Sequence, residues 1–524
     1  MFDRRDFLKY AGACGLSVTA GCSLSNIRAS ASDRKPNIVL ILVDDLGYGH
    51  FGANMADYTA ADLNMEYVQR DIDNGDPTYD IDKAMEAARE STKHLTAIAS
   101  EGVRCSEAYV PLPLCAPSRA AIMTGRYPQR YGTYCNLDVG YRIGLPLDEY
   151  CLANVLKDVG YTNGVIGKWH LQQFDIPKYV KDPERRKKQH PLKRGFDYYY
   201  GFNHSTSVYY NPDHWYRNYE KVQVKQFTTD AITKEAIDFI EREKDNPFFL
   251  YVAYNAVHDP LFEDAPEKYL KRFDLGSHRA NNFNAYVAAL DDGIGSIMNK
   301  LKTLGLDKDT LFVFLSDNGP AGDREVPLPA AGPLTGNKGQ LWQGGVKTPM
   351  IVRYPRRLPA GKTYRGLVSS MDILPTAIAA AGSKIPLELN VDGKNMLPAL
   401  NNGDFDVHEE LFFAGEHCNY FGLYGKSARK DAKEEDIDVR GSSPVGWAVR
   451  KGDYMLRYWP HLERYELYNV VKDSSEKNDL LKNSDGSYEK MLHQLKQNYK
   501  QWFSQMKRPV LSSDKHWDDL YPKY

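Results

Sequence analysis

The sequence predicts an α/β protein with a mainly parallel central sheet flanked by helices, and a smaller C-terminal α+β subdomain that carries an antiparallel sheet. Two observations predict the main part. Continuous apolar runs of strand length recur along the chain, as expected of strands buried on both faces. Helical patterns lie between them, with apolar residues three and four positions apart. Strands that alternate with helices are typical of a parallel sheet covered by helices.

The first apolar run covers residues 37–43 and opens the globular part of the chain. Later runs of the same kind cover 162–166, 248–253, 311–315 and 350–353. The clearest helical pattern covers 285–304, where Val287, Leu290, Ile294, Ile297 and Leu301 share one face. These segments predict the strands and one long helix of the large domain.

Beyond residue 400 the pattern changes. Residues 447–458 alternate around a Lys-Gly-Asp turn and predict a hairpin. Residues 465–470 predict a further strand, and 488–502 predict a closing helix. We therefore expect a large α/β domain at 35–404 and a C-terminal subdomain at 405–524.

The N-terminus is typical of an export signal. Arg4-Arg5-Asp6-Phe7-Leu8-Lys9 precedes a weakly apolar stretch at 10–20, which is too short for a bilayer span of about 20 residues. This pattern predicts a twin-arginine signal over residues 1–22, read by the twin-arginine export machinery. Residues 19–22 resemble a lipoprotein cleavage site, so both a periplasmic protein and a cell-surface lipoprotein anchored through Cys22 remain open.

The composition of the chain limits the kinds of molecule that it is expected to bind. The 524 residues carry a net charge of −2, with 42% hydrophobic and 26% charged residues. These values are ordinary for a globular protein. The near-zero charge argues against a general nucleic-acid binder, since nothing global would attract phosphate backbones. No later segment is long and apolar enough for a transmembrane helix, so a membrane would be reached only through the lipid anchor.

Acidic side chains follow two of the predicted strands. The first run ends in Asp44-Asp45, and the run at 311–315 leads into Asp317-Asn318. In parallel α/β sheets the ligand crevice lies outside the carboxyl ends of the strands. Carboxylates gathered there would repel one another without a positive charge between them, and such oxygen ligands suit Ca²⁺ or Mg²⁺ better than zinc. Taken alone, Asp44-Asp45 would equally fit an acidic turn.

Residues 114–125 carry the strongest chemical signal. Pro117-Ser118 marks a helix start and Gly125 can end the helix. Cys115 would then lie just before a helix N-terminus, where free N–H groups and the helix dipole favour an anion. Arg119 follows one turn later and could direct its guanidinium at the same anion. A structural cysteine needs no such surroundings.

Cys115-Ala-Pro-Ser-Arg119, followed by Thr-Gly-Arg-Tyr-Pro at 124–128, resembles the signature of the type I sulfatases, in particular bacterial polysaccharide sulfatases. In that family the cysteine is oxidised to formylglycine (3-oxoalanine). The resemblance extends over most of the chain and implies an alkaline-phosphatase-like fold with its catalytic domain at 35–404. Further matching segments are 43–48, 167–170, 256–260, 316–319, 338–339, 344–345, 372–376 and 466–468. Gln343 departs from the family, which often has Glu there.

The resemblance also implies a cation site and a nucleophile. The cation is Ca²⁺ rather than Mg²⁺, and its expected ligands are Asp44, Asp45, Asp317, Asn318 and residue 115. The hydrated aldehyde at 115 would supply one hydroxyl that attacks sulfur and a second whose proton is lost to expel sulfate. A serine has no second hydroxyl, which explains why this chemistry needs an aldehyde.

Other matching positions imply acid–base and sulfate-binding roles. His170 would accept the proton of the second hydroxyl, and His258 would protonate the leaving alcohol. Lys338 is the second candidate for that acid or a sulfate ligand. Lys168 and Arg119 would bind sulfate and orient residue 115.

A sulfated carbohydrate or polysaccharide is the expected substrate of such an exported enzyme. His204, Tyr210 and His214, in the loop 201–215, are candidate sugar contacts, although such loops are as often surface packing. Two other classes remain open. One is a phosphatase or phosphonate hydrolase of the same superfamily, which the context of Cys115 disfavours. The other is a non-catalytic glycan-binding surface protein, in which one of the implied positions would be missing, and none is.

Modification of Cys115 would require a partner, either a formylglycine-generating enzyme or an anaerobic sulfatase-maturing enzyme. Since the twin-arginine route carries folded proteins, oxidation would have to precede export. Four cysteines would then remain in the mature chain outside the signal, and an exported compartment would permit disulfides among them without a predictable pairing. They are Cys105, Cys135, Cys151 and Cys418.

Overall fold

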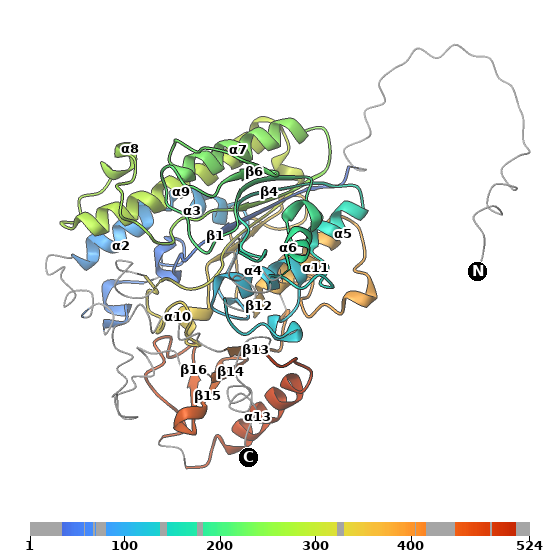
Figure 1. Cartoon of the computed structure of the whole chain (residues 1–524). Helices are drawn as coiled ribbons and strands as arrows, with labels where there is room; N and C mark the ends of the chain where they lie inside the picture. The colour runs from blue at the N-terminus through green and yellow to red at the C-terminus, as the bar shows by residue number, and fades with distance from the viewer. Residues whose placement is uncertain are drawn as a thin grey trace, which may run out of the picture. The chain divides into compact units, whose positions relative to one another are not determined.

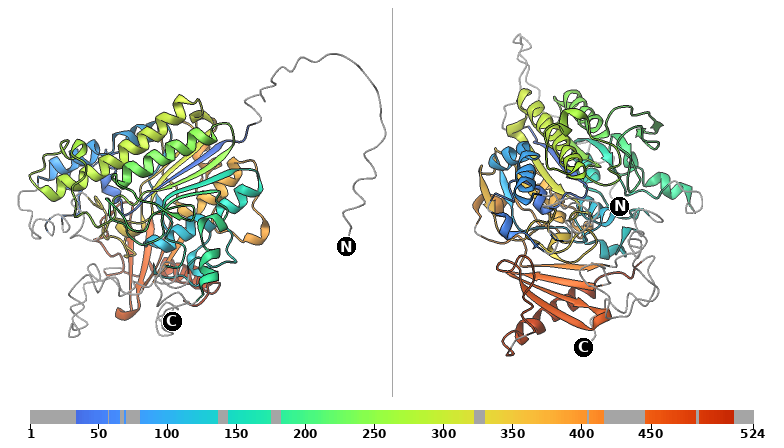
Figure 2. Two further views of the ribbon diagram at one scale, coloured as in Figure 1. Left: turned by 45° about the horizontal axis from the view of Figure 1, so that its top comes forward. Right: turned by 90° about the vertical axis from the view of Figure 1, so that its left-hand side faces the viewer.

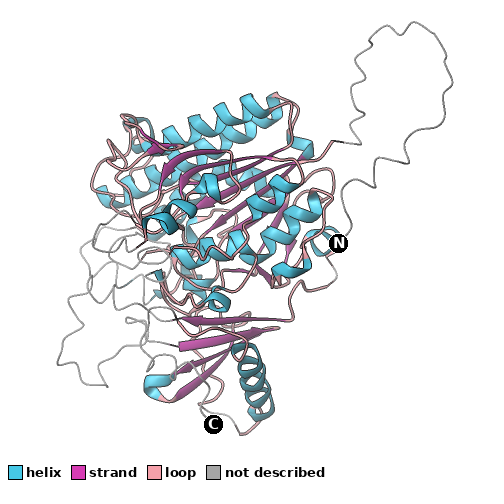
Figure 3. Ribbon diagram, turned by 45° about the vertical axis from the view of Figure 1, so that its right-hand side comes forward, coloured by secondary structure: helices cyan, strands magenta, loops and turns pink. Residues whose placement is uncertain are grey.

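A ten-stranded mixed sheet forms the centre of the computed structural model (Figure 1; Figure 3). The structure describes residues 34–56, 58–65, 69, 80–136, 144–174, 182–321, 330–403, 405–415, 446–482 and 485–509. Residues 35–524 form one compact unit. The predicted export signal, Cys22 and Cys418 lie outside the described residues. Among the helices described, none has the length and apolarity to cross a membrane.

The central sheet has the strand order β11-β2-β10-β9-β1-β8-β4-β5-β6-β7. Its strands in chain order are β1 (Asn37–Val43), β2 (Val103–Cys105), β4 (Thr162–Lys168), β5 (Tyr198–Phe202), β6 (Tyr216–Arg217), β7 (Glu220–Lys221), β8 (Phe248–Ala253), β9 (Thr310–Ser316), β10 (Met350–Arg353) and β11 (Lys362–Tyr364). The five central strands, from β9 to β5, are parallel. This confirms the mainly parallel sheet, although β10 runs antiparallel to β9.

Helices cover both faces of this sheet (Figure 2). On one face lie α2 (Ile81–Glu90), α3 (Lys93–Ser100), α7 (Thr228–Glu243) and α9 (His278–Thr303). On the other lie α4 (Cys115–Thr124), α5 (Leu152–Asp158), α11 (Ile373–Ala380) and α12 (Leu397–Asn402). Strand β1 alternates between the two cores: Val39 and Ile41 pack on the first face, and Leu40 and Leu42 on the second. The predicted helix at 285–304 is α9, which begins seven residues earlier because Ser277 caps it.

Short elements complete the large domain. Strands β3 (Ala108–Tyr109) and β12 (Val368–Ser369) pair with each other. The short helices are α6 (Pro183–Lys188), α8 (Glu267–Leu270) and α10 (Gln343–Val346). The 3₁₀ helices of this domain are η1 (Tyr48–His50), η2 (Ala60–Asp62), η3 (Pro128–Tyr131), η5 (Pro191–Lys193), η6 (Asp307–Asp309), η7 (Ser370–Asp372) and η8 (Leu387–Leu389), whereas η11 (Pro460–Leu462) belongs to the C-terminal part.

The C-terminal part carries a separate antiparallel sheet, as predicted (Figure 3). Its strands in order are β13 (Glu410–Gly415), β14 (Gly446–Lys451), β15 (Tyr454–Trp459) and β16 (Arg464–Asn469). The hairpin β14–β15 and the following strand confirm the sequence pattern, whereas β13 was not predicted. Helix α13 (Glu489–Phe503) packs on this sheet, where Tyr499 stacks on Trp447 with ring centroids 3.9 Å apart.

Gln343 joins the two parts of the chain. Its side-chain amide donates to the carbonyl oxygens of Val470 at 3.3 Å and Ser474 at 3.2 Å, while its own oxygen accepts from the hydroxyl of Tyr109 at 3.1 Å. A glutamate at this position could not donate to two carbonyl groups. The departure from the family pattern therefore serves the contact with the C-terminal part.

Candidate active site

Four buried polar residues meet where β1 and β9 end side by side. The strands pair in parallel up to Val43 and Ser316, so Asp44-Asp45 and Asp317-Asn318 emerge at the same edge. The amide of Asn318 donates to Asp45 at 2.6 Å, and the backbone N–H of Asp45 donates to Asp317 at 3.4 Å. All four are fully buried. The sequence thus placed these residues together correctly.

Cys115 reaches this group from the first turn of α4. Its Sγ lies 3.6 Å from Oδ1 of Asp44. The helix begins at Cys115 itself, which corrects the prediction that the cysteine lies just before a helix beginning at Pro117. Pro117 is accommodated because the first four N–H groups of a helix have no partner within it. Gly125 ends the helix with φ of 66°, as predicted.

Arg119 and Lys168 balance the buried carboxylates. Arg119 donates from Nε to Asp317 at 3.0 Å, and its Nη2 forms ion pairs with Asp317 at 2.8 Å and Asp44 at 3.4 Å. Lys168 Nζ donates to Asp44 at 2.5 Å. Burial would raise the pKa of Asp44, but Lys168, then His258 and Arg119, hold it well below its usual range. Asp44 is therefore ionised at neutral pH.

Gly167 allows Lys168 to enter this cluster. It lies in β4 with φ of 104°, and a Cβ there would come 1.9 Å from the backbone oxygen of Ala253 in β8. Only glycine fits so close an approach of two strands.

His258 and Lys338 approach Asp45 from other loops. Lys338 Nζ donates to Asp45 at 2.9 Å, and His258 Nε2 lies 3.6 Å from the same carboxylate. Burial and Lys338 lower the pKa of His258, but Asp45 and Asp44 outweigh them and raise it well above its usual range. Asp259 lies 2.9 Å from His258 Nδ1. This contact was missed from the sequence, although Asp259 directly follows the histidine.

His170 is buried beside Lys168 in a different electrostatic environment. Neither of its ring nitrogens has a hydrogen-bond partner among the residues that the structure describes. Burial, then Lys168 and Arg119, lower its pKa well below the usual range. Phe174 stacks on the ring at 5.6 Å. The two histidines that the sequence singled out thus lie in opposite electrostatic environments, which lower the pKa of His170 and raise that of His258.

The residues present fit a hard divalent cation. Asp44, Asp45, Cys115 and His258 each offer a ligand atom within 4.8 Å of the others. Asn318 adds a buried side-chain oxygen without a hydrogen-bond partner among the described residues, and Asp317 adds another carboxylate. Carboxylate and amide oxygens are the ligands that Ca²⁺ takes.

The three predicted sugar contacts lie in the loop between β5 and β6. His204 stacks on Phe174 at 4.9 Å, and Phe174 in turn stacks on His170, so the three rings form one aromatic stack that begins at the buried His170. His214 is exposed and lies 4.7 Å from the His204 ring. Tyr210 instead packs on Phe227 and donates its hydroxyl to Asp264.

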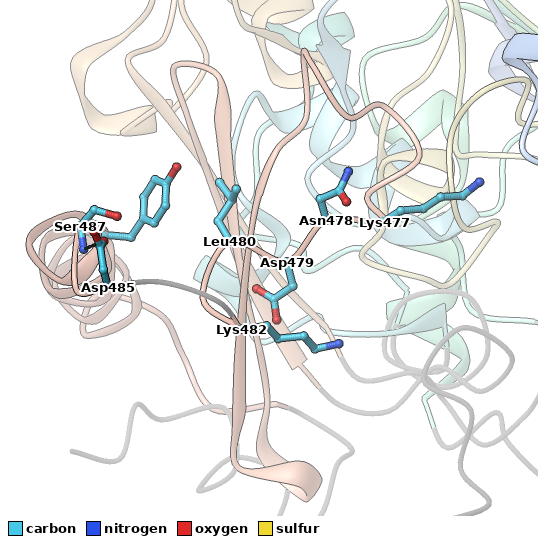
Figure 4. A pocket seen from close by; sticks show the side chains of 8 residues that line it. Lys477, Asn478, Asp479, Leu480, Lys482, Asp485 and Ser487 are labelled. Atoms are coloured by element: carbon cyan, nitrogen blue, oxygen red, sulfur yellow. Dashed lines mark hydrogen bonds between the residues drawn. The ribbon is translucent and has the colours of Figure 1, made fainter.

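Two other features lie apart from these residues. A cavity of about 510 Å³ in the C-terminal part is lined by residues of 477–488, among them Lys477, Lys482 and Tyr488 (Figure 4). His94, Asp291 and Asp292 form a second group with ligand atoms close together. There, Asp291 accepts from the backbone N–H groups of residues 94 and 95 and so caps α3.

Comparison with known proteins decides the family. The sulfatase family model matches residues 36–383. The chain belongs to the sulfatase family. It is therefore a sulfuric ester hydrolase with an alkaline-phosphatase-like fold, and the cluster around Cys115 lies at the position that the family signature marks.

Relatives and solved structures agree with this assignment. The sulfatase is 36% identical over 473 residues to the uncharacterized sulfatase YdeN of Escherichia coli K12, covering 85% of this chain and 82% of that protein. It is 30% identical to the human N-acetylgalactosamine-6-sulfatase, covering 74% and 70%. The crystal structure of Ps i-CgsB in complex with k-i-k-neocarrahexaose matches with a TM-score of 0.72 at 28% identity, covering 93% of this chain and 97% of that one.

Cys105, Cys115, Cys135 and Cys151 are all buried. Cys105 and Cys151 are free thiols. The question of pairing that the sequence left open is thus answered for these two of the four cysteines outside the signal and the site.

Proposed function

We propose that the enzyme removes sulfate from a sulfated carbohydrate, with formylglycine at position 115 as nucleophile and Ca²⁺ as cofactor. The observation that carries this proposal is the position of Cys115 at a helix N-terminus, in contact with Asp44 and surrounded by buried cations. Sγ occupies the place that the oxygens of the modified residue would take. The hydrated aldehyde would supply one hydroxyl to attack sulfur and a second whose deprotonation releases sulfate.

Asp44, Asp45, Asp317 and Asn318 would hold the cation, which supplies charge neutralisation to the sulfate and to residue 115. In the structure Lys168 and Lys338 neutralise Asp44 and Asp45. With a cation bound to these carboxylates, the two lysines are available for sulfate. Together with Arg119 they form fixed positive charge around the transferring group.

The two histidines divide the proton transfers. His170 is neutral and desolvated, so it can accept the proton of the second hydroxyl at residue 115. A bound cation would lower its pKa further and preserve this role. His258 has its Nδ1 held by Asp259 at 2.9 Å, so Nε2 is the atom that would protonate the leaving alcohol of the sugar.

A carbohydrate substrate is supported by the relatives. One relative is named an N-acetylgalactosamine-6-sulfatase, and a similar solved structure holds a neocarrahexaose. The N-terminal pattern supports export through the twin-arginine route, with anchoring through Cys22 left open, after a maturing enzyme has oxidised Cys115 in the cytoplasm.

The test is the Cys115→Ala variant. We expect at least about a thousandfold loss of kcat/KM on an aryl sulfate and on sulfated oligosaccharides, in a protein that stays folded by circular dichroism. Cys105→Ala is the matched control, because Cys105 is equally buried but lies in strand β2, between β10 and β11. Full activity of Cys115→Ala would refute the proposal, as would hydrolysis of phosphate esters with none of sulfate esters.

Modification can be measured separately. Peptide mass analysis should find residue 115 as the aldehyde only after co-expression with a maturing enzyme, and activity should follow its fraction. Active protein with an intact thiol at position 115 would contradict the assigned nucleophile.

A further inference from the structure

Phe262 is an exposed aromatic ring close in sequence to the catalytic acid. It exposes 90% of its surface, more than any other aromatic residue among those described. It lies four residues after His258, and four residues span at most about 14 Å. We propose that Phe262 is a sugar-stacking platform that binds a pyranose ring next to the sulfated one. This inference rests on the proposed carbohydrate substrate and adds a subsite to it.

The backbone on both sides of Phe262 is fixed to helix α9. The side-chain amide of Asn282 donates to the carbonyl oxygens of Glu263 at 3.0 Å and Leu261 at 3.5 Å, and its oxygen accepts from the N–H of Ala265 at 2.8 Å. The hydroxyl of Tyr286 also donates to Glu263. The segment thus holds a solvent-exposed ring on a backbone tied to a long buried helix, and such preorganisation lowers the entropy cost of binding.

The same segment is bonded to the loop that carries the predicted sugar contacts. Thr206 donates to the carbonyl oxygen of Asp259 at 2.5 Å, and Tyr210 donates to that of Asp264 at 3.1 Å. Tyr209 donates to the carbonyl oxygen of His258 at 2.8 Å. Residues 203–210 and 258–265 therefore form one connected rim beside the catalytic acid. The hydroxyl of Tyr210 links the two segments of this rim, and the exposed ring of Phe262 gives the rim an apolar surface.

A pyranose ring suits this surface. Its axial C–H groups form an apolar face whose hydrogens meet the negative face of an aromatic ring, while its hydroxyl groups stay in water. An isolated exposed phenyl ring gains from leaving water when a ligand covers it. An aryl sulfate occupies the sulfate-binding end only. The subsite should therefore distinguish oligosaccharides from small sulfate esters.

The test compares substrates of different length in Phe262→Ala and Phe262→Trp. The probes are k-i-k-neocarrahexaose, a sulfated chondroitin hexasaccharide and an aryl sulfate. For the hexasaccharide that is turned over, Phe262→Ala should raise KM about tenfold, equivalent to about 1.4 kcal/mol, with kcat changed less than twofold. Phe262→Trp keeps an aromatic ring at this position, so its KM should stay close to the wild-type value. The ratio of kcat/KM for hexasaccharide over aryl sulfate should fall in the alanine variant.

A measurement of oligosaccharide binding tests the subsite without requiring turnover. Calorimetric titration of each hexasaccharide into Cys115→Ala, with and without Phe262→Ala, should show about tenfold weaker binding in the double variant. Leu387→Ala is the matched control, since Leu387 exposes 96% of its surface in η8. Equal binding with and without the phenyl ring, a similar effect in the control, or no binding of either probe would overturn the inference. If binding to Cys115→Ala depends on Phe262 but the matured wild-type enzyme releases no sulfate from the same oligosaccharide, the proposed function is refuted and the subsite is retained.

Discussion

At the scale of single residues, the site keeps two side chains in unusual backbone conformations. Asp45 has φ of 61° and His170 has φ of 56°. Left-handed conformations of residues other than glycine cost on the order of 1–3 kcal/mol and gather at functional sites. Both residues come two positions after a strand ends, where Asp45 lies close to Cys115 and His170 lies close to Lys168 and Arg119. The strain is therefore part of how the sheet edge presents these side chains.

The protonation of Asp317 should couple cation binding to pH. Burial, then the neighbouring Asp44, raise the pKa of Asp317 to about 6, so below that pH a cation must displace a proton. The Kd for Ca²⁺ should rise up to about tenfold per pH unit below about pH 6. The measurement is the increase in Tm with Ca²⁺ concentration at pH 7 and pH 5. Equal affinity at the two values would contradict the expectation, and Asp317→Asn should bind weakly at both.

At the scale of elements, local patterns predicted the strands that bring the site together. Strands β1, β8 and β9 are buried on both faces and form continuous apolar runs in the sequence, so the pattern alone places Asp44 and Asp317 at one edge of the sheet. Strand β13 has the same kind of burial but adjoins residues with no strand pattern. The start of α4 was predicted at Pro117 because proline is common as the first residue of a helix. In the structure Pro117 is the third residue of α4.

Contacts between distant segments could not be predicted in this way. The stacking of Phe174 on His170 depends on the path of the loop after β4. The pairing of Lys168 with Asp44 depends on the order of β4, β8 and β1 in the sheet. The family signature supplied these roles, and only the folded chain supplied their partners.

The 3₁₀ helix η5 should make folding stability depend on pH. His190 caps it: Nδ1 accepts from the N–H of Leu192 at 3.3 Å. Burial lowers the pKa of His190 to about 4, below the value of about 6.5 in an unfolded chain. The unfolded chain binds the proton first, so this contribution to stability is lost as the pH falls from about 6.5 to about 4. His190→Asn keeps a cap acceptor without titrating, so its Tm should fall less than wild type between pH 7 and pH 5. An identical fall in both proteins would exclude His190 as a source of acid lability.

At the scale of the whole molecule, the C-terminal sheet supports the loop that carries Lys338. Arg457 in β15 donates from Nε to the carbonyl oxygen of Leu341 at 2.9 Å and forms a buried ion pair with Glu476. Glu476 accepts from the N–H of Gln343 at 3.0 Å. Residues 341–343 lie just after Lys338, which reaches Asp45. The C-terminal part therefore helps to position Lys338 beside Asp45.

Gln343→Glu tests this connection. The carboxylate cannot donate to Val470 and Ser474, and it would place a buried negative charge near Glu476. Leaving such polar groups unpaired should lower the free energy of unfolding by about 1–3 kcal/mol, measured by urea denaturation. Gln501→Glu on the exposed face of α13 is the control and should change it by less than about 0.5 kcal/mol. Because Lys338 keeps its direct partner Asp45, kcat/KM should fall less than tenfold. Unchanged stability would mean that the C-terminal sheet is held in place without Gln343.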